Sequence, residues 1–270
     1  MSRIARIDPD PDGERRRAAR ARLGLHDDTP VRRRRPWRAL WWWGVACALL
    51  SIAPVALLRM VNPPLTALMI GEWWDAQRAG TQGFRLEQDW QPLHRLSPFA
   101  AAAVIAAEDQ KFFTHHGFDF EAIRAVLAAR DAGQPLRGAS TLSQQVAKNL
   151  FLWRGRQWLR KGLEAWLTVW IEVLWSKERI LEVYLNIAQF GPGRYGVGAA
   201  SRAYFGHAAA TLSADEAALL AGVLPNPVRY RVNDPGPWLR QRQAWILRQM
   251  RQLGLPRPSA PPRLDPDAHI

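Results

Sequence analysis

A run of twenty residues from Ala39 to Leu58, ALWWWGVACALLSIAPVALL, contains no charged side chain. An α-helix rises ~1.5 Å per residue, so this run would reach roughly 30 Å, about the thickness of a bilayer core. Its three consecutive Trp residues suit the headgroup region, and a membrane span tolerates Pro54 better than a soluble helix does. We therefore predict a single transmembrane anchor over residues 37–60. A buried core helix and a cleaved signal peptide are the alternatives; the run is long for a signal sequence, and no small-x-small cleavage site follows it.

The segment before this run is basic and poor in large apolar residues. Residues 1–36 hold eleven Arg and six acidic residues, so we expect a disordered tail that cannot bury enough surface to fold. Arg32–Arg35 and Arg38 flank the run, and the positive-inside rule puts such a cluster in the cytoplasm, with everything after Leu58 on the outer face. Nucleic-acid binding is the other interpretation of the arginines and of the net charge of +13. Beside a membrane span, topology and contact with anionic lipid explain them more simply, so we expect no nucleic-acid partner.

The remaining sequence predicts one mainly α-helical domain over residues 61–254, followed by a Pro-rich flexible tail at 255–270. With 48% hydrophobic residues the chain can form a sizeable core, and no sustained apolar/polar alternation of the strand kind is present. The only cysteine, Cys47, lies in the apolar run, so neither a disulfide framework nor a cysteine metal site is expected. Helix patterns and capping signals, among them Ser97-Pro98, Thr141-x-x-Gln144 and Ser213-x-x-Glu216, predict helices near 98–109, 119–130, 141–151, 157–175, 177–187, 194–204, 213–223 and 236–252.

One of these helices carries a polar stripe. At 100° per residue, Thr141, Gln144, Gln145 and Lys148 fall on one side of the helix at 141–151, opposite its apolar residues. The pattern fits a binding surface with one cation. An ordinary solvated face is the alternative.

The next helix concentrates charge in one place. Glu164 shares its face with Arg160 at i−4 and Lys161 at i−3, within an otherwise very apolar sequence. A carboxylate and two cations are thus concentrated in one patch, although a plain helix-stabilising ion pair would show the same spacing.

Glu108 is the candidate for acid–base chemistry. It ends an Ala-rich helix, with Asp109 beside it and Phe112 one turn later. Partial desolvation and a like charge would both raise its carboxyl pKa toward a value useful for proton transfer. A surface pair of acids is the alternative. His115 and His116 follow without any known metal-ligand spacing, so we predict no metal site and a structural His at the turn before Gly117.

Five ordered motifs, spread from about Ser97 to Leu253, give the sequence a clear resemblance. They are EDQKFFTHHGFD at 108–119, GASTLSQQVAKNLF at 138–151, RKGLE at 160–164, KERILEVYLNIAQFGPGRYGVGAAS at 177–201 and LSADEAALLAGVLPNPVRY at 212–230. The chain resembles the monofunctional biosynthetic peptidoglycan glycosyltransferases of family 51. Ala139 departs from the pattern, because many two-domain relatives have a second Gly there.

The resemblance implies a lysozyme-like α-helical domain on the periplasmic face of the inner membrane that joins lipid II units into glycan strands. Glu108 matches the family's catalytic base, which takes the proton of the acceptor's 4-hydroxyl as that oxygen attacks with inversion and releases undecaprenyl pyrophosphate. Glu164 matches the second carboxylate, beside the departing pyrophosphate. The motifs imply substrate binding, to sugar or pyrophosphate, by Asp109, Ser140, Thr141, Gln144, Gln145, Lys148, Asn149, Arg160 and Lys161.

Some relatives are fused to a penicillin-binding transpeptidase, whose nucleophile lies in an S-x-x-K motif. This sequence contains no S-x-x-K, so we expect glycan polymerisation without peptide crosslinking. The residues around Leu65–Ile70, with Trp73 and Trp74, suggest either a flap that enters the membrane or a segment that packs against the anchor.

A lysozyme-like glycan hydrolase or lytic transglycosylase remains the alternative function, because a glutamate in a helical cleft can also protonate a glycosidic oxygen. The cluster of cations argues against it, since a hydrolase has no pyrophosphate to neutralise. A catalytically silent scaffold is a third hypothesis. Lipid II, the growing glycan and membrane lipids are the expected partners, with division or elongation proteins as an open addition. No cofactor is certain; a divalent cation at Glu164 and Asp109 stays open, with no closed ligand set in the sequence.

Overall fold

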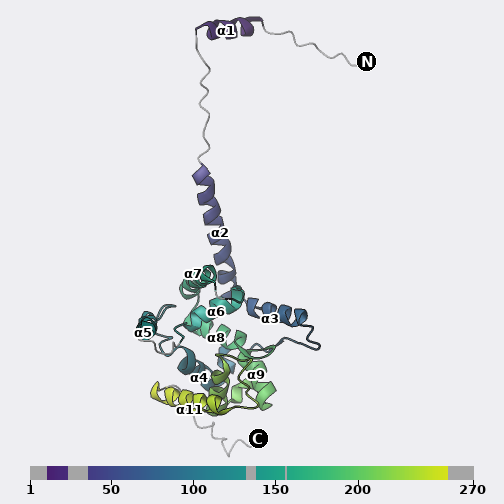
Figure 1. Ribbon diagram of the computed structural model, residues 1–270, viewed down its shortest axis with the longest axis vertical. Helices are drawn as coiled ribbons and strands as arrows, with labels where there is room; N and C mark the ends of the chain where they lie inside the picture. The colour runs from purple at the N-terminus through teal and green to yellow at the C-terminus, as the bar shows by residue number, and fades with distance from the viewer. Residues whose placement is uncertain (1–10, 24–35, 132–137, 156, 255–270) are drawn as a thin grey trace, which may run out of the picture. The chain divides into compact units, whose positions relative to one another are not determined.

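The computed structural model describes residues 11–23, 36–131, 138–155 and 157–254 (Figure 1). The chain from Ala48 onward forms one compact unit, and the chain up to Cys47 forms another. Two of the features predicted from the sequence, the Arg cluster at 32–35 and the Pro-rich tail at 255–270, lie outside the described residues.

Two helices precede the main domain, α1 (Pro11–Arg22) and α2 (Pro36–Leu58). Helix α1 lies within the segment expected to be a disordered tail, and its described side chains are all exposed. In α2 the window Trp41–Leu58 is apolar and long enough to cross a membrane, and only 6% of it is buried. That low burial argues against a core helix, so the prediction of a membrane anchor is supported.

The main domain is mainly helical, as predicted. All eight helices expected after the anchor are present, with ends within two residues of the predicted ones, whereas α3 was not predicted. The helices of this domain are α3 (Ala67–Arg78), α4 (Pro98–Glu108), α5 (Phe120–Asp131), α6 (Leu142–Phe151), α7 (Trp158–Leu174), α8 (Lys177–Ile187), α9 (Gly196–Phe205), α10 (Ala214–Val223) and α11 (Pro237–Gln252), with 3₁₀ turns η1 (Leu93–Arg95) and η2 (Ala209–Thr211).

The capping signals explain where several of these helices begin. The Ser97 hydroxyl accepts the backbone N–H of Phe99 ahead of a first-turn proline. Reciprocal capping boxes join Thr141 to Gln144 at the start of α6, and Ser213 to Glu216 at the start of α10. Each box provides acceptors for two backbone N–H groups that the helix would leave unpaired, and this fixes where the helix starts.

A small sheet, which the sequence did not predict, lies beside α3. Its strands are β1 (Glu87–Gln88), β2 (Gln189–Gly191) and β3 (Arg194–Tyr195); β3 is central, parallel to β1 and antiparallel to β2. The buried carboxylate of Glu72 in α3 accepts hydrogen bonds from the Gln189 amide at 2.7 Å, the Gly193 backbone at 3.2 Å and the Tyr195 hydroxyl. Helix α3 is therefore bonded to the domain.

Two groups of helices make the core. Helix α10 packs against α4 and α11, and α6 packs against α3, α7 and α8. Figure 1 shows α4 and α11 together at one end of the domain, with α6, α7 and α8 at the other. Glu108, the last residue of α4, contacts Gln145 of α6, and a cavity lies where the two groups of helices meet.

Arg179 of α8 holds the chain that leaves α2. Its guanidinium donates to the carbonyls of Leu58 and Val61, at 2.9 and 3.0 Å, and to the Asn62 side chain at 2.8 Å. It also pairs with Glu182 at 2.7 Å. Because charge-assisted hydrogen bonds of a half-buried group are among the stronger ones, this residue should fix the end of α2 on the domain.

We predict that Arg179→Gln destabilises the domain by about 1.5 to 3 kcal/mol, because the substitution removes hydrogen bonds from a charged group to backbone carbonyls. The measurement is thermal or denaturant unfolding in detergent. Arg202→Gln is the control: Arg202 pairs with Asp89 at 3.0 Å but its side chain is 63% exposed, so its loss should cost no more than about 1 kcal/mol. Equal losses in the two variants would contradict the role given to Arg179.

Candidate active site

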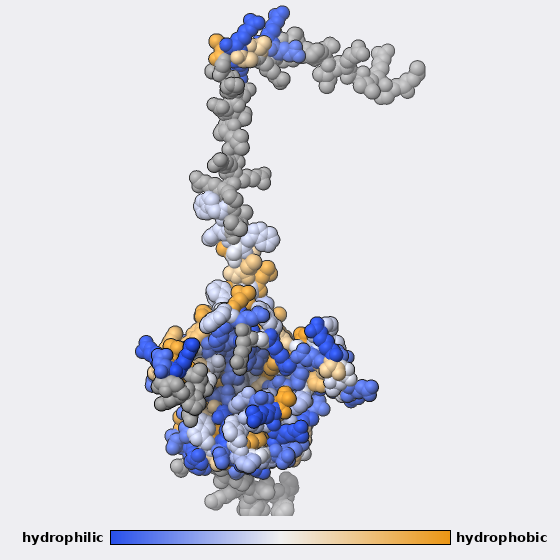
Figure 2. All heavy atoms as spheres, viewed as in Figure 1, coloured by the Kyte–Doolittle hydropathy of each residue, from blue (hydrophilic) through white to orange (hydrophobic). Residues whose placement is uncertain are grey.

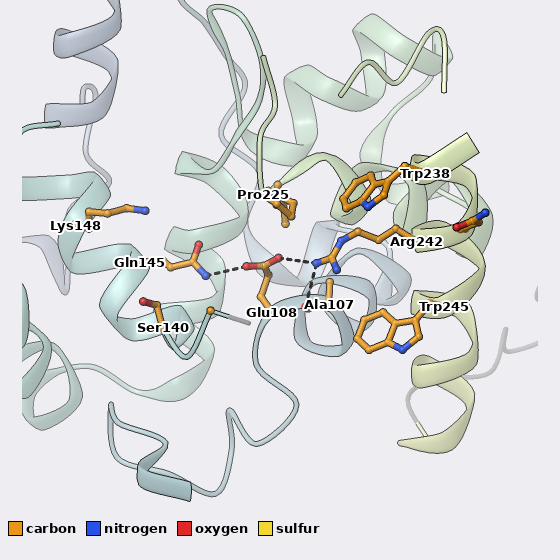
Figure 3. A pocket seen from close by; sticks show the side chains of 12 residues that line it. Ala107, Glu108, Ser140, Gln145, Lys148, Pro225, Trp238, Arg242 and Trp245 are labelled. Atoms are coloured by element: carbon orange, nitrogen blue, oxygen red, sulfur yellow. Dashed lines mark hydrogen bonds and ion pairs between the residues drawn. The ribbon is translucent and has the colours of Figure 1, made fainter. Parts of the chain in front are cut away.

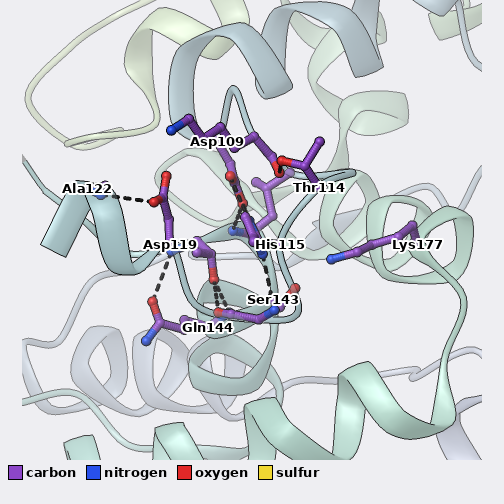
Figure 4. A network of polar contacts seen from close by, with 12 residues as sticks. Asp109, Thr114, His115, Asp119, Ala122, Ser143, Gln144 and Lys177 are labelled. Atoms are coloured by element: carbon purple, nitrogen blue, oxygen red, sulfur yellow. Dashed lines mark hydrogen bonds and ion pairs between the residues drawn. The ribbon is translucent and has the colours of Figure 1, made fainter.

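Asp109 joins the end of α4 to the beginning of α6. Its carboxylate accepts the backbone N–H of Leu142 at 2.9 Å and contacts Nε2 of His115 at 2.9 Å (Figure 4). Nδ1 of His115 accepts the backbone N–H of Gly117 at 3.1 Å, so Nε2 carries the proton that is donated to Asp109. The structural role predicted for His115 at this turn is confirmed.

The turn at Gly117 completes the connection. Gly117 has φ +89°, and a Cβ there would lie 2.9 Å from the Thr168 side chain, so only glycine fits. Its carbonyl accepts the Thr141 hydroxyl at 2.7 Å. Thr141 thus binds the turn and caps α6 at once. Asp109, His115, Gly117 and the first turn of α6 form one buried hydrogen-bonded network.

This network places Glu108, the last residue of α4, over a cavity of about 790 Å³ (Figure 3). The cavity walls come from α4, the segment before α6, α6 itself, the segment after α10, and α11. The lining residues are Ala107, Glu108, Gly138, Ser140, Gln145, Lys148, Leu224, Pro225, Trp238, Gln241, Arg242 and Trp245.

Glu108 is held from two sides. One carboxylate oxygen accepts the Gln145 amide at 3.0 Å, and the other lies 3.4 Å from Nη2 of Arg242. The Tyr184 hydroxyl donates to the Gln145 carbonyl oxygen at 3.1 Å, which directs the amide N–H₂ of Gln145 toward Glu108. The carboxylate is therefore oriented before any substrate binds.

Burial raises the pKa of Glu108 above its ordinary value, while the Gln145 hydrogen bond and the positive charges of Arg242 and Lys148 act in the opposite direction. The sequence predicted this direction. It also named Asp109 as a cause, and that was wrong, because Asp109 points away into its bonds with His115 and Leu142. The side chain of Glu108 is only 15% exposed, so the interpretation as a surface acid pair is wrong too.

Lys148 stands between the two carboxylates of the site. Burial lowers the pKa of Lys148, and the negative charges of Glu164 and Glu108 oppose this effect. Glu164 is buried and forms ion pairs with Arg160 at 2.9 Å and with Lys161. The predicted charge cluster on α7 is therefore present, and it lies within electrostatic reach of a cation that lines the cavity.

The carboxylates suggested for a divalent cation do not fit one. The oxygens of Asp109 accept from His115 and Leu142, and those of Glu164 pair with Arg160 and Lys161, so neither residue has a free oxygen pair for a metal. Within the described ranges, no group of three or more His, Cys, Asp or Glu residues could hold a metal ion.

The structure divides the remaining residues predicted for substrate binding. Ser140 and Gln145 line the cavity with Lys148. Asp109, Thr141, Gln144 and Asn149 are buried, and the first three serve the hydrogen bonds that hold α6 in place. The predicted stripe of α6 is thus neither solvated nor wholly available to a ligand: its first turn supports the framework, and Gln145 and Lys148 face the cavity.

Sequence reasoning missed the wall formed by α11. Trp238, Arg242 and Trp245 lie at spacings of four and three, which puts them on one face of the helix. That spacing was the available signal. It gave no functional indication, because nothing local relates α11 to Glu108.

Comparisons with known proteins agree with the resemblance drawn from the motifs. The family model described as Transglycosylase matches residues 76–251. A biosynthetic peptidoglycan transglycosylase of Klebsiella oxytoca is 56% identical over 211 residues, 78% of this chain and 87% of the relative. Proteins of the same name from Xylella fastidiosa (strain M23) and Xanthomonas campestris pv. campestris (strain B100) are 50% identical over 231 residues and 48% identical over 236 residues. These alignments cover 85% and 86% of this chain and 95% and 96% of the relatives. The chain belongs to the transglycosylase family.

Proposed function

We propose that this chain polymerises the glycan strands of peptidoglycan, transferring the growing strand from its undecaprenyl pyrophosphate carrier to lipid II. Glu108 acts as the base. As the 4-hydroxyl oxygen of the acceptor forms its bond to the donor's anomeric carbon, the bond from that carbon to the pyrophosphate oxygen breaks, and the hydroxyl proton passes to the Glu108 carboxylate. The configuration inverts from α to β.

The observation that carries this proposal is the setting of Glu108. A carboxylate with a raised pKa, oriented by Gln145 and facing a large cavity, is suited to accept a proton from an alcohol near neutral pH.

The cations on the α6–α7 side support the choice of leaving group. Negative charge accumulates on the departing pyrophosphate, so cations already fixed in place stabilise the transition state more than the bound substrate. Lys148 lines the cavity, and Arg160 and Lys161 are held beside it by Glu164. We assign Glu164 to positioning these cations.

The surface supports a membrane-bound orientation. Trp158, Leu159, Trp166 and Val173 form an exposed apolar face on α7, on the opposite side of the helix from Arg160 and Glu164. Trp166 and Trp175 donate their indole N–H groups to Ser51 and to the Val55 carbonyl of α2. Hydrophobic residues are visible on the part of α2 next to the domain and where the helix joins it (Figure 2).

This continuity of apolar surface favours contact of α7 with lipid where α2 leaves the bilayer. Ile70, Trp73 and Trp74 of α3 are also exposed, and we extend the lipid contact to them. With the Arg-rich flank in the cytoplasm, the domain would act on the periplasmic face of the inner membrane. Association with division or elongation proteins stays a prediction from the resemblance.

Glu108→Gln should abolish polymerisation while lipid II binding is kept, because the amide keeps the shape of the side chain but cannot accept the proton. We expect a loss of at least about 100-fold. The measurement is incubation of the detergent-solubilised protein with labelled lipid II, followed by separation of the products before and after muramidase digestion.

Glu178→Gln, at an exposed glutamate of α8, should polymerise normally and controls for the substitution itself. Full activity of Glu108→Gln would overturn the proposal. Cleavage of preformed glycan by the unmodified protein, without polymer formation, would favour the hydrolase instead.

Lys148→Ala should lower the turnover rate about 100- to 1,000-fold, as expected for loss of one preorganised group that stabilises transition-state charge. Steady-state kinetics with lipid II would separate this effect on kcat from an effect on KM. Lys111→Ala is the control, because Lys111 is exposed and pairs with Glu121 outside the cavity. A Lys148 variant that changes only KM would remove the residue from transition-state stabilisation.

Glu108→Gln should also raise the stability of the folded chain at neutral pH. The folded-state pKa of Glu108 is above its ordinary value of 4.5, so ionisation of this carboxyl disfavours folding at pH values above that. Below the ordinary value both states bind the proton and the penalty disappears. Melting temperatures of the two proteins should differ at pH 7 and converge as the pH falls below 4.5. A Glu108→Gln variant that melts lower than the unmodified protein at pH 7 would contradict the raised pKa.

A further inference from the structure

Arg242 contacts the base from the side opposite to α6. In the part of the chain that the structure describes, it is the one cation found in direct contact with Glu108, at 3.4 Å, and Nη2 lies equally far from the Ala107 carbonyl. The two residues are 134 positions apart in the sequence. They meet because α11 packs against α4, so the contact belongs to the packing of the domain.

Two tryptophans hold the guanidinium of Arg242. Its central carbon lies 5.8 Å from the Trp238 ring and 5.7 Å from the Trp245 ring, both from α11 (Figure 3). Trp238 is itself stacked on Tyr230, with ring centroids 4.0 Å apart and planes 11° from parallel. Cation–π contacts on both sides restrict where the guanidinium can go.

The hydrogen bonding of Arg242 is directed at Glu108. Its Nε is buried and has no hydrogen-bond partner in the described structure. An unpaired Nε alone does not set Arg242 apart, because the Nε of Arg179, which has a structural role, is also buried and unpaired. What sets Arg242 apart is its target: its Nη2 is directed at the carboxylate oxygen of Glu108 that Gln145 does not use.

We propose that Arg242, clamped between Trp238 and Trp245, is a positioning residue that holds Glu108 ionised and directed into the cavity, ready to take the acceptor proton. This inference rests on the proposed function of Glu108 as the base.

The surroundings of Glu108 support this role. Three other polar groups face it or act on it: the Gln145 amide and Lys148 ammonium of α6, and the buried Tyr184 phenol of α8, which feels its negative charge. Lys148 acts from a distance and is shared with Glu164. The positive charge of Arg242, in direct contact with Glu108, thus lowers the Glu108 pKa and opposes the effect of burial, which raises it. Without this charge, a larger share of Glu108 would be protonated at neutral pH and unable to act as a base.

The test is the pH profile of kcat/KM for glycan polymerisation by the full chain in detergent, with Arg242→Gln, Arg242→Lys and the unmodified protein. We expect Arg242→Gln to move the acid limb of the profile upward by ~1 pH unit, because an opposite charge at this distance lowers a carboxyl pKa by about that much or more. Activity should approach that of the unmodified protein at high pH. Arg242→Lys, which keeps the charge, should give a smaller shift.

Arg248→Gln is the matched control, since Arg248 is an exposed arginine of the same helix, and its profile should coincide with that of the unmodified protein. An Arg242→Gln profile that is lowered equally at every pH, or is unchanged, overturns the proposal. If Arg242→Gln does not fold, Arg242→Met, which also removes the charge but keeps an unbranched side chain, carries the test, and an unshifted acid limb in that variant overturns the proposal.

A second readout does not depend on activity. The melting temperature of the Arg242→Gln variant, compared with that of Arg242→Gln/Glu108→Gln across pH, reports the Glu108 pKa through stability. Both pairs of curves should diverge above pH 4.5, the ordinary pKa of the carboxyl, but the difference in melting temperature should keep growing to a higher pH in the pair that lacks Arg242 than in the pair that contains it. A shift in this stability readout without any polymerisation would refute the proposed function but keep the role of Arg242. Polymerisation without a shift in the stability readout would support the proposed function but refute the role of Arg242.

Discussion

The carboxylate of Asp109 is the interaction on which the candidate site depends. It receives the backbone N–H of Leu142 and the imidazole of His115, and so fixes the end of α4 against the beginning of α6. The neighbouring residue, Glu108, is then held within hydrogen-bonding distance of Gln145, one turn into α6. Two adjacent acids thereby acquire opposite tasks: the oxygens of Asp109 are used within the framework, whereas the raised pKa of Glu108 makes it available for proton transfer.

The sequence predicted the helices well because their signals are local. Capping boxes at Thr141 and Ser213 and the proline after Ser97 lie within a few residues of the helix starts that they set. The small sheet escaped prediction, because strands of two or three residues show no alternation, and β1 is defined only by its pairing with β3 across more than a hundred positions. Helix α3 was likewise missed as a helix, although its apolar residues were noted.

The site was predictable only in part, for the same physical reason. Residue types and their similarity to a known family pointed to Glu108, Lys148 and the charge cluster at Glu164. The sequence could not show which partner each side chain faces. Thr141 and Gln144 lie on the same face as Gln145 and Lys148. However, the side chains of Thr141 and Gln144 form hydrogen bonds within the helix cap and to the Gly117 turn. The role of Arg242 could not be predicted from the sequence, because its contact with Glu108 depends on how α11 packs on α4.

Charge and apolar surface are arranged around α7 in a way that fits an amphipathic substrate. One side of this helix carries Arg160 and Glu164 toward Lys148, and the other exposes Trp158 and Val173. A ligand with a sugar pyrophosphate head and a long hydrocarbon tail requires cations for the head and an apolar surface for the tail, a short distance apart. Because the end of α2 is bonded to α7 and α8, the helix that enters the membrane and the helix that presents the cations cannot move apart freely. The proposed chemistry therefore requires the hydrocarbon tail of the substrate and helix α2 of the enzyme to lie on the same side of the cavity. The membrane surface would then help to orient the donor toward Glu108.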